Sequence, residues 1–437
     1  MNSASGGSSG GGGSGGSAKQ SKHSGADVMA GVSRELQVGV VGAGAMGSGI
    51  AQLAAMAGHH TVLFDTDAGA LTRAVAGIEK NLARSVEKGR MSDTEAALAR
   101  KRVICVGSDG GGGGGGGAAL DQLEGCGFVI EAIVETLDAK QNLFFRLEEV
   151  VPADAVLATN TSSLSITAIA QACQRPERLI GVHFFNPPTV LPLVEIVPGL
   201  ATSGEVTRFA RALIDAWGKT TVIASDTPGF IVNRIARPFY GEALRIYEEG
   251  IAGMSTIDWA MREIGGFKMG PFELMDFIGN DINFAATKSV YEATFHDSRF
   301  KPFITQQRLF DAGFFGRKTG RGYYDYSEGA GVPEPDRNTE LGDLIFRRIL
   351  SMLINQAAEA VYYRIATARD VDLAMTLGVN YPKGLLQWAD EVGIQETVNW
   401  LGALHEFYGE ERYRPSPLLK TMAADGFTFF SSPGVTE

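Results

Sequence analysis

The sequence of 437 residues has little cysteine, no excess of basic residues and no long apolar run. Its three cysteines, Cys105, Cys126 and Cys173, have neither paired spacing nor metal-ligand spacing, so we expect free thiols in a reducing compartment and no metal site. The net charge of -11 argues against nucleic acid as a partner, because a phosphate backbone selects a basic surface. No stretch approaches the roughly 20 apolar residues of a membrane-spanning helix. We expect a soluble, cytoplasmic protein.

Two segments have too few apolar residues to form a core. Residues 1–35 are mostly glycine and serine and are predicted to be a disordered arm. The arm lacks the apolar core of a secretory signal, and its single arginine, Arg34, is poor for a transit peptide. The glycine run at 110–117 is predicted to be an expanded surface loop, because no Lys-Ser/Thr helix start follows it.

Short apolar runs alternate with helical patterns over residues 36–226. This alternation predicts an α/β domain with a mostly parallel sheet. The expected strands lie at 37–41, 61–65, 128–133, 156–159, 179–184 and 193–197. From residue 227 the pattern becomes helical, and Asp226 or Thr227 is expected to cap the helix that carries Asn233.

The helical part repeats itself with a shift of 114 residues and no gap. Eight identical pairs carry the repeat: Arg234/Arg348, Ile235/Ile349, Ala243/Ala357, Asp258/Asp372, Met261/Met375, Gly270/Gly384, Asp276/Asp390 and Gly279/Gly393. Two tandem all-α domains are therefore expected after the Rossmann-type domain, at 227–326 and 343–437, with a linker at 327–342.

A glycine-rich turn predicts a dinucleotide site. Gly42, Gly44 and Gly47 follow an apolar strand and open a helix, with Ala45 and Met46 between them. The free N–H groups at the helix start suit a pyrophosphate. Asp65, about 20 residues on at the end of the next strand, suits the ribose hydroxyls of NAD and disfavours the 2′-phosphate of NADP.

Two polar residues interrupt apolar strands in a way that suggests acid–base chemistry. His183 ends one strand, and Glu195 lies in the next, where an unpaired carboxylate would be costly to bury. We expect Glu195 to orient His183, which can accept a proton from a hydroxyl near neutral pH. A lone histidine in such a strand is more often a core residue, but the acidic residue Glu195 in the next strand favours a catalytic role for His183.

Two further groups can hold a substrate oxygen. Ser162 and Ser163 follow the strand at 156–159, and their alternative role is to cap a helix before Ile166. The alternative for Asn233 is a position on the surface of a helix with no functional role. Arg237, near Asn233, is a candidate contact for a distal carboxylate, although a helix-surface role is favoured for it.

These motifs together resemble the L-3-hydroxyacyl-CoA dehydrogenase family over about residues 36–326. The resemblance is carried by the glycine turn, Asn160-Thr161-Ser162-Ser163-Leu164, His183-Phe184-Phe185-Asn186-Pro187, the segments 227–234 and 269–273, and Gly316-Arg317-Lys318-Thr319-Gly320. It implies reversible NAD-dependent oxidation of a 3-hydroxyacyl-CoA to the 3-oxoacyl-CoA, in fatty-acid (β-oxidation) or aromatic-compound degradation.

The resemblance also implies individual roles. His183 is then the general base, Glu195 its partner, and Ser162 and Asn233 hold the reacting oxygen. Further cofactor contacts are implied at Glu135, Lys140 and Lys318, and a coenzyme A contact near Lys88, for which a solvated lysine is equally expected.

The second helical copy is expected to be non-catalytic. Arg347 stands at the position of Asn233, and the segment 316–320 has no counterpart after Phe430. We expect this copy to take the place of a partner subunit, giving an intrachain pseudo-dimer or a homo-oligomer. Two alternatives to the acyl-CoA dehydrogenase stay open: a non-catalytic, crystallin-like NAD-binding protein, and a dehydrogenase of free β-hydroxy acids.

Overall fold

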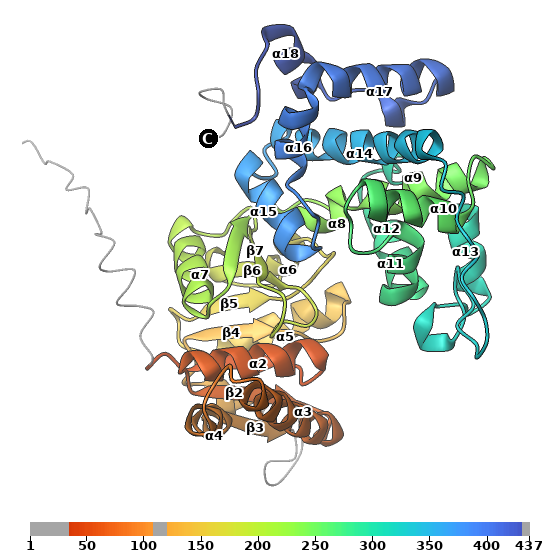
Figure 1. Cartoon of the computed structure of the whole chain (residues 1–437). Coiled ribbons are helices and arrows are strands. Elements are labelled where there is room, and N and C mark those ends of the chain that lie inside the picture. Colours follow the sequence, from red (N-terminus) through yellow and green to blue (C-terminus); the bar gives the residue numbers. More distant parts are fainter. Residues whose placement is uncertain (1–34, 108–119, 431–437) are drawn as a thin grey trace, which may run out of the picture.

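The computed structural model describes residues 35–107 and 120–430 (Figure 1). The predicted arm, apart from Glu35, and the predicted loop at 110–117 lie outside these ranges. Among the described helices, none has the length and apolar character needed to cross a membrane.

An eight-stranded sheet forms the first part of the molecule, in the order β3-β2-β1-β4-β5-β6-β7-β8. The strands are β1 (Val38–Val41), β2 (Thr61–Asp65), β3 (Val103–Gly107), β4 (Phe128–Glu131), β5 (Val156–Thr159), β6 (Leu179–Phe184), β7 (Leu193–Pro198) and β8 (Thr220–Ile223). Neighbouring strands are parallel except β6 and β7, which are antiparallel. The predicted α/β fold is confirmed.

Six of these strands are predicted from the sequence, whereas β3 and β8 are not. The two missed strands are the outermost ones of the sheet. An edge strand is only partly covered, so its apolar pattern is weak: Ile104 of β3 is 50% exposed, and Thr220 and Ile223 of β8 are half-buried. β3 also follows directly on a helix rich in charged residues.

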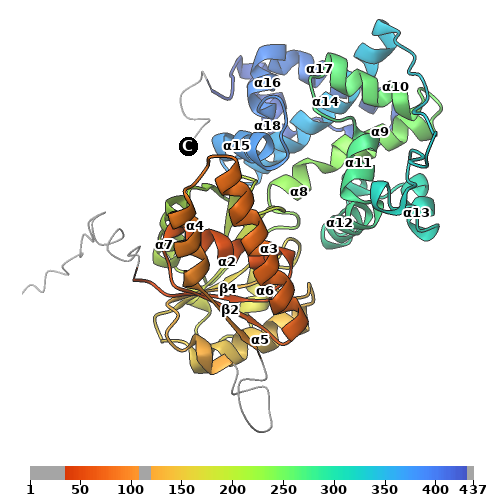
Figure 2. The ribbon, with the colours of Figure 1, turned by 60° about the horizontal axis from the view of Figure 1, so that its bottom comes forward.

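Helices cover both faces of the sheet (Figure 2). The helices of this part are α2 (Ala45–Ala57), α3 (Ala68–Glu87), α4 (Asp93–Arg102), η1 (Leu120–Leu123), α5 (Leu137–Val150), α6 (Ile166–Ala170), η2 (Pro176–Arg178) and α7 (Gly204–Ala216). Side chains of α2, α3, α4 and α7 share one apolar cluster with the strands. Those of η1, α5 and α6 share the other cluster, which continues into the helical region.

The helical region consists of two segments, which lie side by side in Figure 1. The first helical segment contains α8 (Val232–Ile235), α9 (Arg237–Glu248), α10 (Met254–Trp259), the π-helical turn η3 (Ala260–Ile264), α11 (Pro271–Ile278), α12 (Asn280–Ala293), η4 (Ser298–Phe300), α13 (Ile304–Asp311) and η5 (Arg317–Thr319). The second helical segment contains α14 (Thr339–Tyr362), α15 (Ala368–Gly378), α16 (Leu385–Val392), α17 (Ile394–Tyr408), η6 (Glu411–Tyr413) and α18 (Pro417–Asp425). α14 begins inside the range 327–342 that the sequence predicts to be a linker.

Two repeated aspartates have the same structural task in both segments. Asp258 accepts two backbone N–H groups at the start of α11, at 2.9 and 3.0 Å, and Asp372 accepts two at the start of α16, at 2.8 and 2.9 Å. Burial raises the pKa of Asp258 to about 7 and that of Asp372 to about 6. Each aspartate therefore accepts hydrogen bonds from N–H groups at the start of the next α-helix, which have no acceptor within that helix.

A second repeated pair, Asp276 and Asp390, holds the end of each segment. Asp276 accepts the backbone N–H groups of Tyr323 and Tyr324, both at 2.9 Å, and Asp390 accepts those of Phe429 and Phe430 at 2.7 and 3.0 Å. Phe429 and Phe430 thus make the contacts that Tyr323 and Tyr324 make in the first segment. The residues after Phe430, where no counterpart of 316–320 is expected, lie outside the described ranges.

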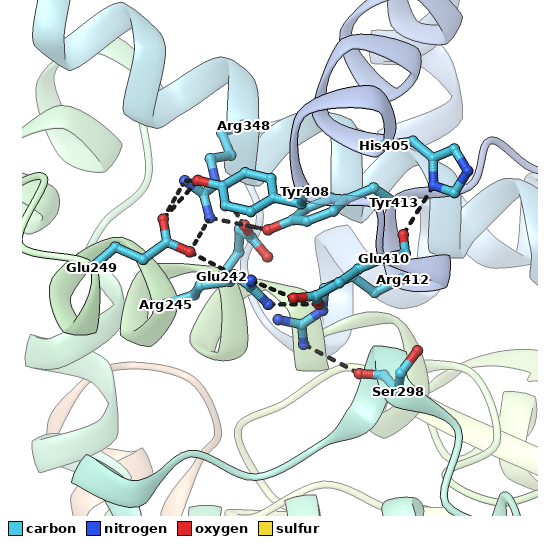
Figure 3. A network of polar contacts seen from close by, with 10 residues as sticks. All are labelled: Glu242, Arg245, Glu249, Ser298, Arg348, His405, Tyr408, Glu410, Arg412 and Tyr413. Atoms are coloured by element: carbon cyan, nitrogen blue, oxygen red, sulfur yellow. Dashed lines mark hydrogen bonds and ion pairs between the residues drawn. The ribbon is translucent and has the colours of Figure 1, made fainter.

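Buried charges join the two segments, as Figure 3 shows. Arg348 of α14 donates to Glu242 at 2.6 Å and to Glu249 at 3.0 Å, both at α9. The hydroxyl groups of Tyr408 and Tyr413 accept from the same guanidinium at 2.7 and 3.0 Å. The Arg348 side chain is 4% exposed and that of Glu242 is 1% exposed, so this pair lies in the interior of the helical region.

We predict that Arg348→Met destabilises the fold. The change leaves the Glu242 carboxylate buried without its counter-charge, which should lower the free energy of unfolding by about 3–5 kcal/mol. Urea denaturation followed by circular dichroism measures the difference. Arg73→Met is the control, because Arg73 forms an exposed ion pair with Asp67 and should change stability by less than about 0.5 kcal/mol. Equal effects of the two substitutions would contradict the prediction.

Candidate active site

The structure places His183 and Glu195 directly opposite each other on the antiparallel strands β6 and β7. The Nδ1 atom of His183 lies 2.7 Å from Oε2 of Glu195. His183 is 5% exposed and Glu195 is fully buried. Strand alternation explains the pairing, since opposed residues on neighbouring strands point to the same face of the sheet.

This pairing determines which nitrogen of His183 is free. An ionised carboxylate only accepts hydrogen bonds, so Nδ1 carries the proton and Nε2 keeps its lone pair. The rings of Phe185 and Phe230 lie 4.5 and 5.8 Å from the imidazole, measured between ring centres. The free Nε2 therefore belongs to an imidazole held in one orientation by a carboxylate and by aromatic packing.

The other carboxylate oxygen of Glu195 binds the backbone at the start of the helical region. Oε1 accepts the backbone N–H groups of Ile231 and Val232 at 3.1 and 2.9 Å, just where α8 begins. The predicted cap at Asp226 or Thr227 is wrong for this helix. Asp226 instead accepts two backbone N–H groups at the start of α6, at 2.9 and 2.7 Å. Glu195 was not foreseen in this second role.

Asn233, the residue after Val232, lies in the single turn of α8 and is half-buried. Because Glu195 binds both His183 and the start of α8, it connects the imidazole with the turn that carries the Asn233 amide. Glu195 thus binds His183 directly and holds the backbone just before Asn233, although these residues come from different parts of the fold.

Ser162 lies in a tight loop after β5 that is organised around Glu135. Oε1 of Glu135 accepts the backbone N–H of Ser162 at 2.8 Å and the Thr161 hydroxyl at 2.6 Å. Burial raises the pKa of Glu135, but the Lys140 ammonium and these hydrogen bonds outweigh it, and the net pKa lies below the ordinary value. The helix cap expected as an alternative is supplied by Ser165, so Ser162 is free of that task.

Lys140 is buried between two carboxylates. Its Nζ lies 2.5 Å from Oε1 of Glu131 and 3.1 Å from Oε2 of Glu135. Glu131, which the sequence analysis does not single out, also accepts the Thr159 hydroxyl at 2.6 Å. The signal for it is the same as for Glu195, an acidic residue in an otherwise apolar strand.

A cavity of about 540 Å³ lies above the glycine turn and has the features of a dinucleotide site. It is lined by Val41, Gly42, Gly44, Phe64, Asp65, Thr66, Leu120, Ala132, Ile133, Val134, Ala139, Asn142, Leu143 and Arg146. A side chain on Gly47 would meet the carbonyl oxygen of Gly42 at 1.8 Å, whereas one on Gly44 would meet nothing within 4 Å. Gly47 is therefore packed against the backbone of the turn, whereas the space beside Gly44 is empty. This space suits a pyrophosphate above the start of α2.

Asp65 lines this cavity at the end of β2. Its Oδ2 accepts the N–H of Ala43 at 2.6 Å, which ties the carboxylate to the glycine turn. Ala45 and Met46 form the first turn of α2. The residues present thus fit NAD.

Two predicted site residues lie away from this cavity. Lys318 belongs to η5 of the first helical segment and pairs with Asp281 at 2.6 Å. Lys88 caps the C-terminal end of α3 and is exposed. Within residues 35–107 and 120–430, no group of three or more histidine, cysteine or acidic side chains could hold a metal ion.

A doubly wound sheet with this turn, followed by helices that complete a buried His–Glu site, defines a nicotinamide-dependent dehydrogenase. Comparison with known families narrows the class. Residues 37–227 match the NAD-binding domain of 3-hydroxyacyl-CoA dehydrogenase, and residues 229–326 and 344–428 match its C-terminal domain. The chain belongs to the 3-hydroxyacyl-CoA dehydrogenase family and is an NAD-dependent oxidoreductase.

Individual relatives agree with this assignment. The chain is 37% identical to 3-hydroxyadipyl-CoA dehydrogenase of Escherichia coli K12, over 88% of this chain and 97% of that protein. It is 40% identical to a probable 3-hydroxybutyryl-CoA dehydrogenase of Bacillus subtilis, over 67% of this chain and 98% of that protein. The crystal structure of a 3-hydroxybutyryl-CoA dehydrogenase from Escherichia coli K12 superposes with a TM-score of 0.82 at 36% identity, over 89% of this chain and 98% of that chain.

We predict that Gly44→Ala weakens NADH binding without lowering stability. The added methyl group meets no protein atom within 4 Å, but it occupies the space that a pyrophosphate needs. Titration of NADH fluorescence should show at least about a tenfold weaker affinity with an unchanged melting temperature. Gly77→Ala, also without neighbours within 4 Å but on α3, is the control and should bind NADH normally. Unchanged affinity in Gly44→Ala would contradict the proposed pyrophosphate position.

Proposed function

We propose that His183 is the general base of the oxidation, that Glu195 orients it, and that Ser162 and Asn233 hold the reacting oxygen of the substrate. The observation that carries this proposal is the buried carboxylate of Glu195, which binds the imidazole on one side and the turn before Asn233 on the other. A base and an oxygen-binding amide held by one group can keep the geometry that proton transfer requires.

The residues act on the hydroxyl of the substrate. Nε2 of His183 takes the proton from the C3 hydroxyl as the C–O bond becomes a carbonyl, and the imidazolium that forms is stabilised by Glu195. Ser162 and Asn233 donate hydrogen bonds to that oxygen and fix the C3 carbon. NAD, when bound, accepts the hydride from C3. In the reverse direction His183 returns its proton to the carbonyl oxygen.

The cofactor contacts follow the same plan. Gly42, Gly44 and Gly47, with Ala45 and Met46, would bind the pyrophosphate, and Asp65 would bind the adenosine ribose and exclude NADP. Glu135, Lys140 and Lys318 are proposed on the nicotinamide side, and the exposed Lys88 is proposed to meet a phosphate of coenzyme A. Lys88 is exposed and offers its ammonium group to such an anion, whereas Lys140 binds Glu131 and Glu135 and Lys318 binds Asp281.

For the acyl group we propose a six-carbon dicarboxylic chain, as in 3-hydroxyadipyl-CoA. The Escherichia coli relative named 3-hydroxyadipyl-CoA dehydrogenase matches 88% of this chain, so the match includes the second helical segment. Relatives named for 3-hydroxybutyryl-CoA include shorter proteins that match about two thirds of the chain, and one solved structure that matches 89% of it.

We propose that the second helical segment is a non-catalytic duplicate in the place of a partner subunit. It repeats the Asp258 and Asp276 contacts of the first segment, but Arg347 replaces Asn233 and lies over the ring of Trp400 at 5.6 Å. Since α14 packs along α9, a single chain buries the surface that two chains would otherwise bury together.

We predict that His183→Gln abolishes the reduction of acetoacetyl-CoA by NADH. Loss of the proton-transferring group should lower kcat at least about 100-fold. The absorbance of NADH measures the rate, and NADH fluorescence titration shows whether the variant still binds cofactor. The native enzyme should be much slower with NADPH and inactive with free acetoacetate. A variant with native activity, or a native protein that prefers free acetoacetate, would contradict this function.

Truncation after residue 330 tests the pseudo-dimer. The shortened chain loses α14 and exposes the apolar and charged face of α9, so we expect it to dimerise, whereas the full chain should not use this face between chains. Light scattering coupled to gel filtration measures the mass of both. A well-folded truncated chain that stays monomeric at high concentration would refute the proposal.

A further inference from the structure

Arg237 is a buried guanidinium one helical turn after Asn233. It is 6% exposed, so the helix-surface role favoured for it from the sequence is wrong. Its Nε donates to the backbone oxygen of Asn233 at 2.8 Å, and Nη1 donates to the Thr287 hydroxyl at 3.1 Å. Its Cζ lies 5.1 Å from the centre of the Tyr240 ring. These contacts hold the guanidinium beside the backbone of Asn233.

No counter-charge accompanies this arginine. Within the described part of the chain no carboxylate lies within ion-pair distance of Arg237, and no hydrogen bond is made by its Nη2. By contrast, Arg348 in the second helical segment is equally buried and binds two glutamates. Burial depresses the pKa of Arg237 below its ordinary value, as expected for a desolvated cation without an anion.

A second donor nearby is also unused. The hydroxyl of Tyr381 is buried without a hydrogen-bond partner and interacts electrostatically with Arg237. Burying a charge without a partner is costly, and buried polar groups normally find partners. An anionic ligand would give the Arg237 cation a counter-charge and the Tyr381 hydroxyl a hydrogen-bond acceptor.

The spacing agrees with a carboxylate on the substrate chain. Asn233 lies in α8 and Arg237 begins α9, and the 2.8 Å hydrogen bond from Nε of Arg237 to the backbone oxygen of Asn233 places the guanidinium beside that residue. In a six-carbon dicarboxylic chain, three bonds of about 1.5 Å separate C3 from the terminal carboxyl carbon, and a hydrogen bond adds about 2.8 Å. A substrate whose C3 oxygen is held by Asn233 can thus reach Arg237 with its far end.

We propose that Arg237 binds the terminal carboxylate of a dicarboxylic 3-hydroxyacyl-CoA and selects it over a monocarboxylic chain of the same length. This inference rests on the proposed function, because it assumes that Asn233 holds the C3 oxygen.

The test compares two six-carbon substrates, 3-oxoadipyl-CoA and 3-oxohexanoyl-CoA, with the full-length native enzyme, Arg237→Met and Arg237→Lys. We expect the native enzyme to prefer the dicarboxylate in kcat/KM. Arg237→Met should lower that preference about 10- to 100-fold, mainly through KM for the dicarboxylate, and Arg237→Lys should retain part of it. Arg262→Met, which removes a half-exposed arginine of η3, is the charge-matched control and should keep the native preference.

A binding measurement separates recognition from catalysis. Adipyl-CoA and hexanoyl-CoA lack the C3 oxygen, so they report on the distal contact alone when used as competitive inhibitors. The inference is overturned if the native enzyme reduces acetoacetyl-CoA but shows no preference for the dicarboxylate, or if Arg237→Met slows both substrates equally. Inactivity of the native enzyme toward every 3-oxoacyl-CoA would instead refute the proposed function.

Discussion

The site of this protein depends on one buried carboxylate, that of Glu195. A carboxylate removed from water must find hydrogen-bond partners, and Glu195 finds three: the imidazole of His183 and the backbone N–H groups of Ile231 and Val232. These partners come from the last part of the sheet and from the first turn of the helical region. The same carboxylate therefore orients the His183 imidazole and binds the backbone where the helical region begins.

The helical region shows what a duplicated domain keeps and what it loses. In both segments one aspartate accepts backbone N–H groups at the start of a helix, and another accepts backbone N–H groups near the end of the segment. Loss of either aspartate would leave these N–H groups without an acceptor. The two segments differ at one predicted site position, because Arg347 stands where Asn233 stands in the first segment. The contacts between the segments, centred on Arg348, join them into one interior. This pattern is that of a segment retained for packing.

Much of the architecture could be predicted from the chain itself. Continuous apolar runs predicted six of the eight strands, and the change to helical periodicity at residue 227 predicted the helical region that follows the sheet. The edge strands β3 and β8 could not be predicted, since one side of each is open and the apolar pattern fades. The cap of α8 could not be predicted either, because the group that satisfies it lies on β7, distant in the sequence, while the nearby Asp226 serves α6.

The sequence by itself determined the class of chemistry, because a glycine turn after a strand, and acidic residues within apolar strands, have few other physical explanations. It also favoured a pairing of Glu195 with His183, because an unpaired carboxylate in an apolar strand is costly to bury. Only the tertiary structure decided that Glu195 also holds the turn before Asn233, that Lys140 lies between two glutamates, and that Arg237 is buried without a counter-charge. Those facts arise from packing between distant segments, and local pattern carries no information about which partner a buried charge will find.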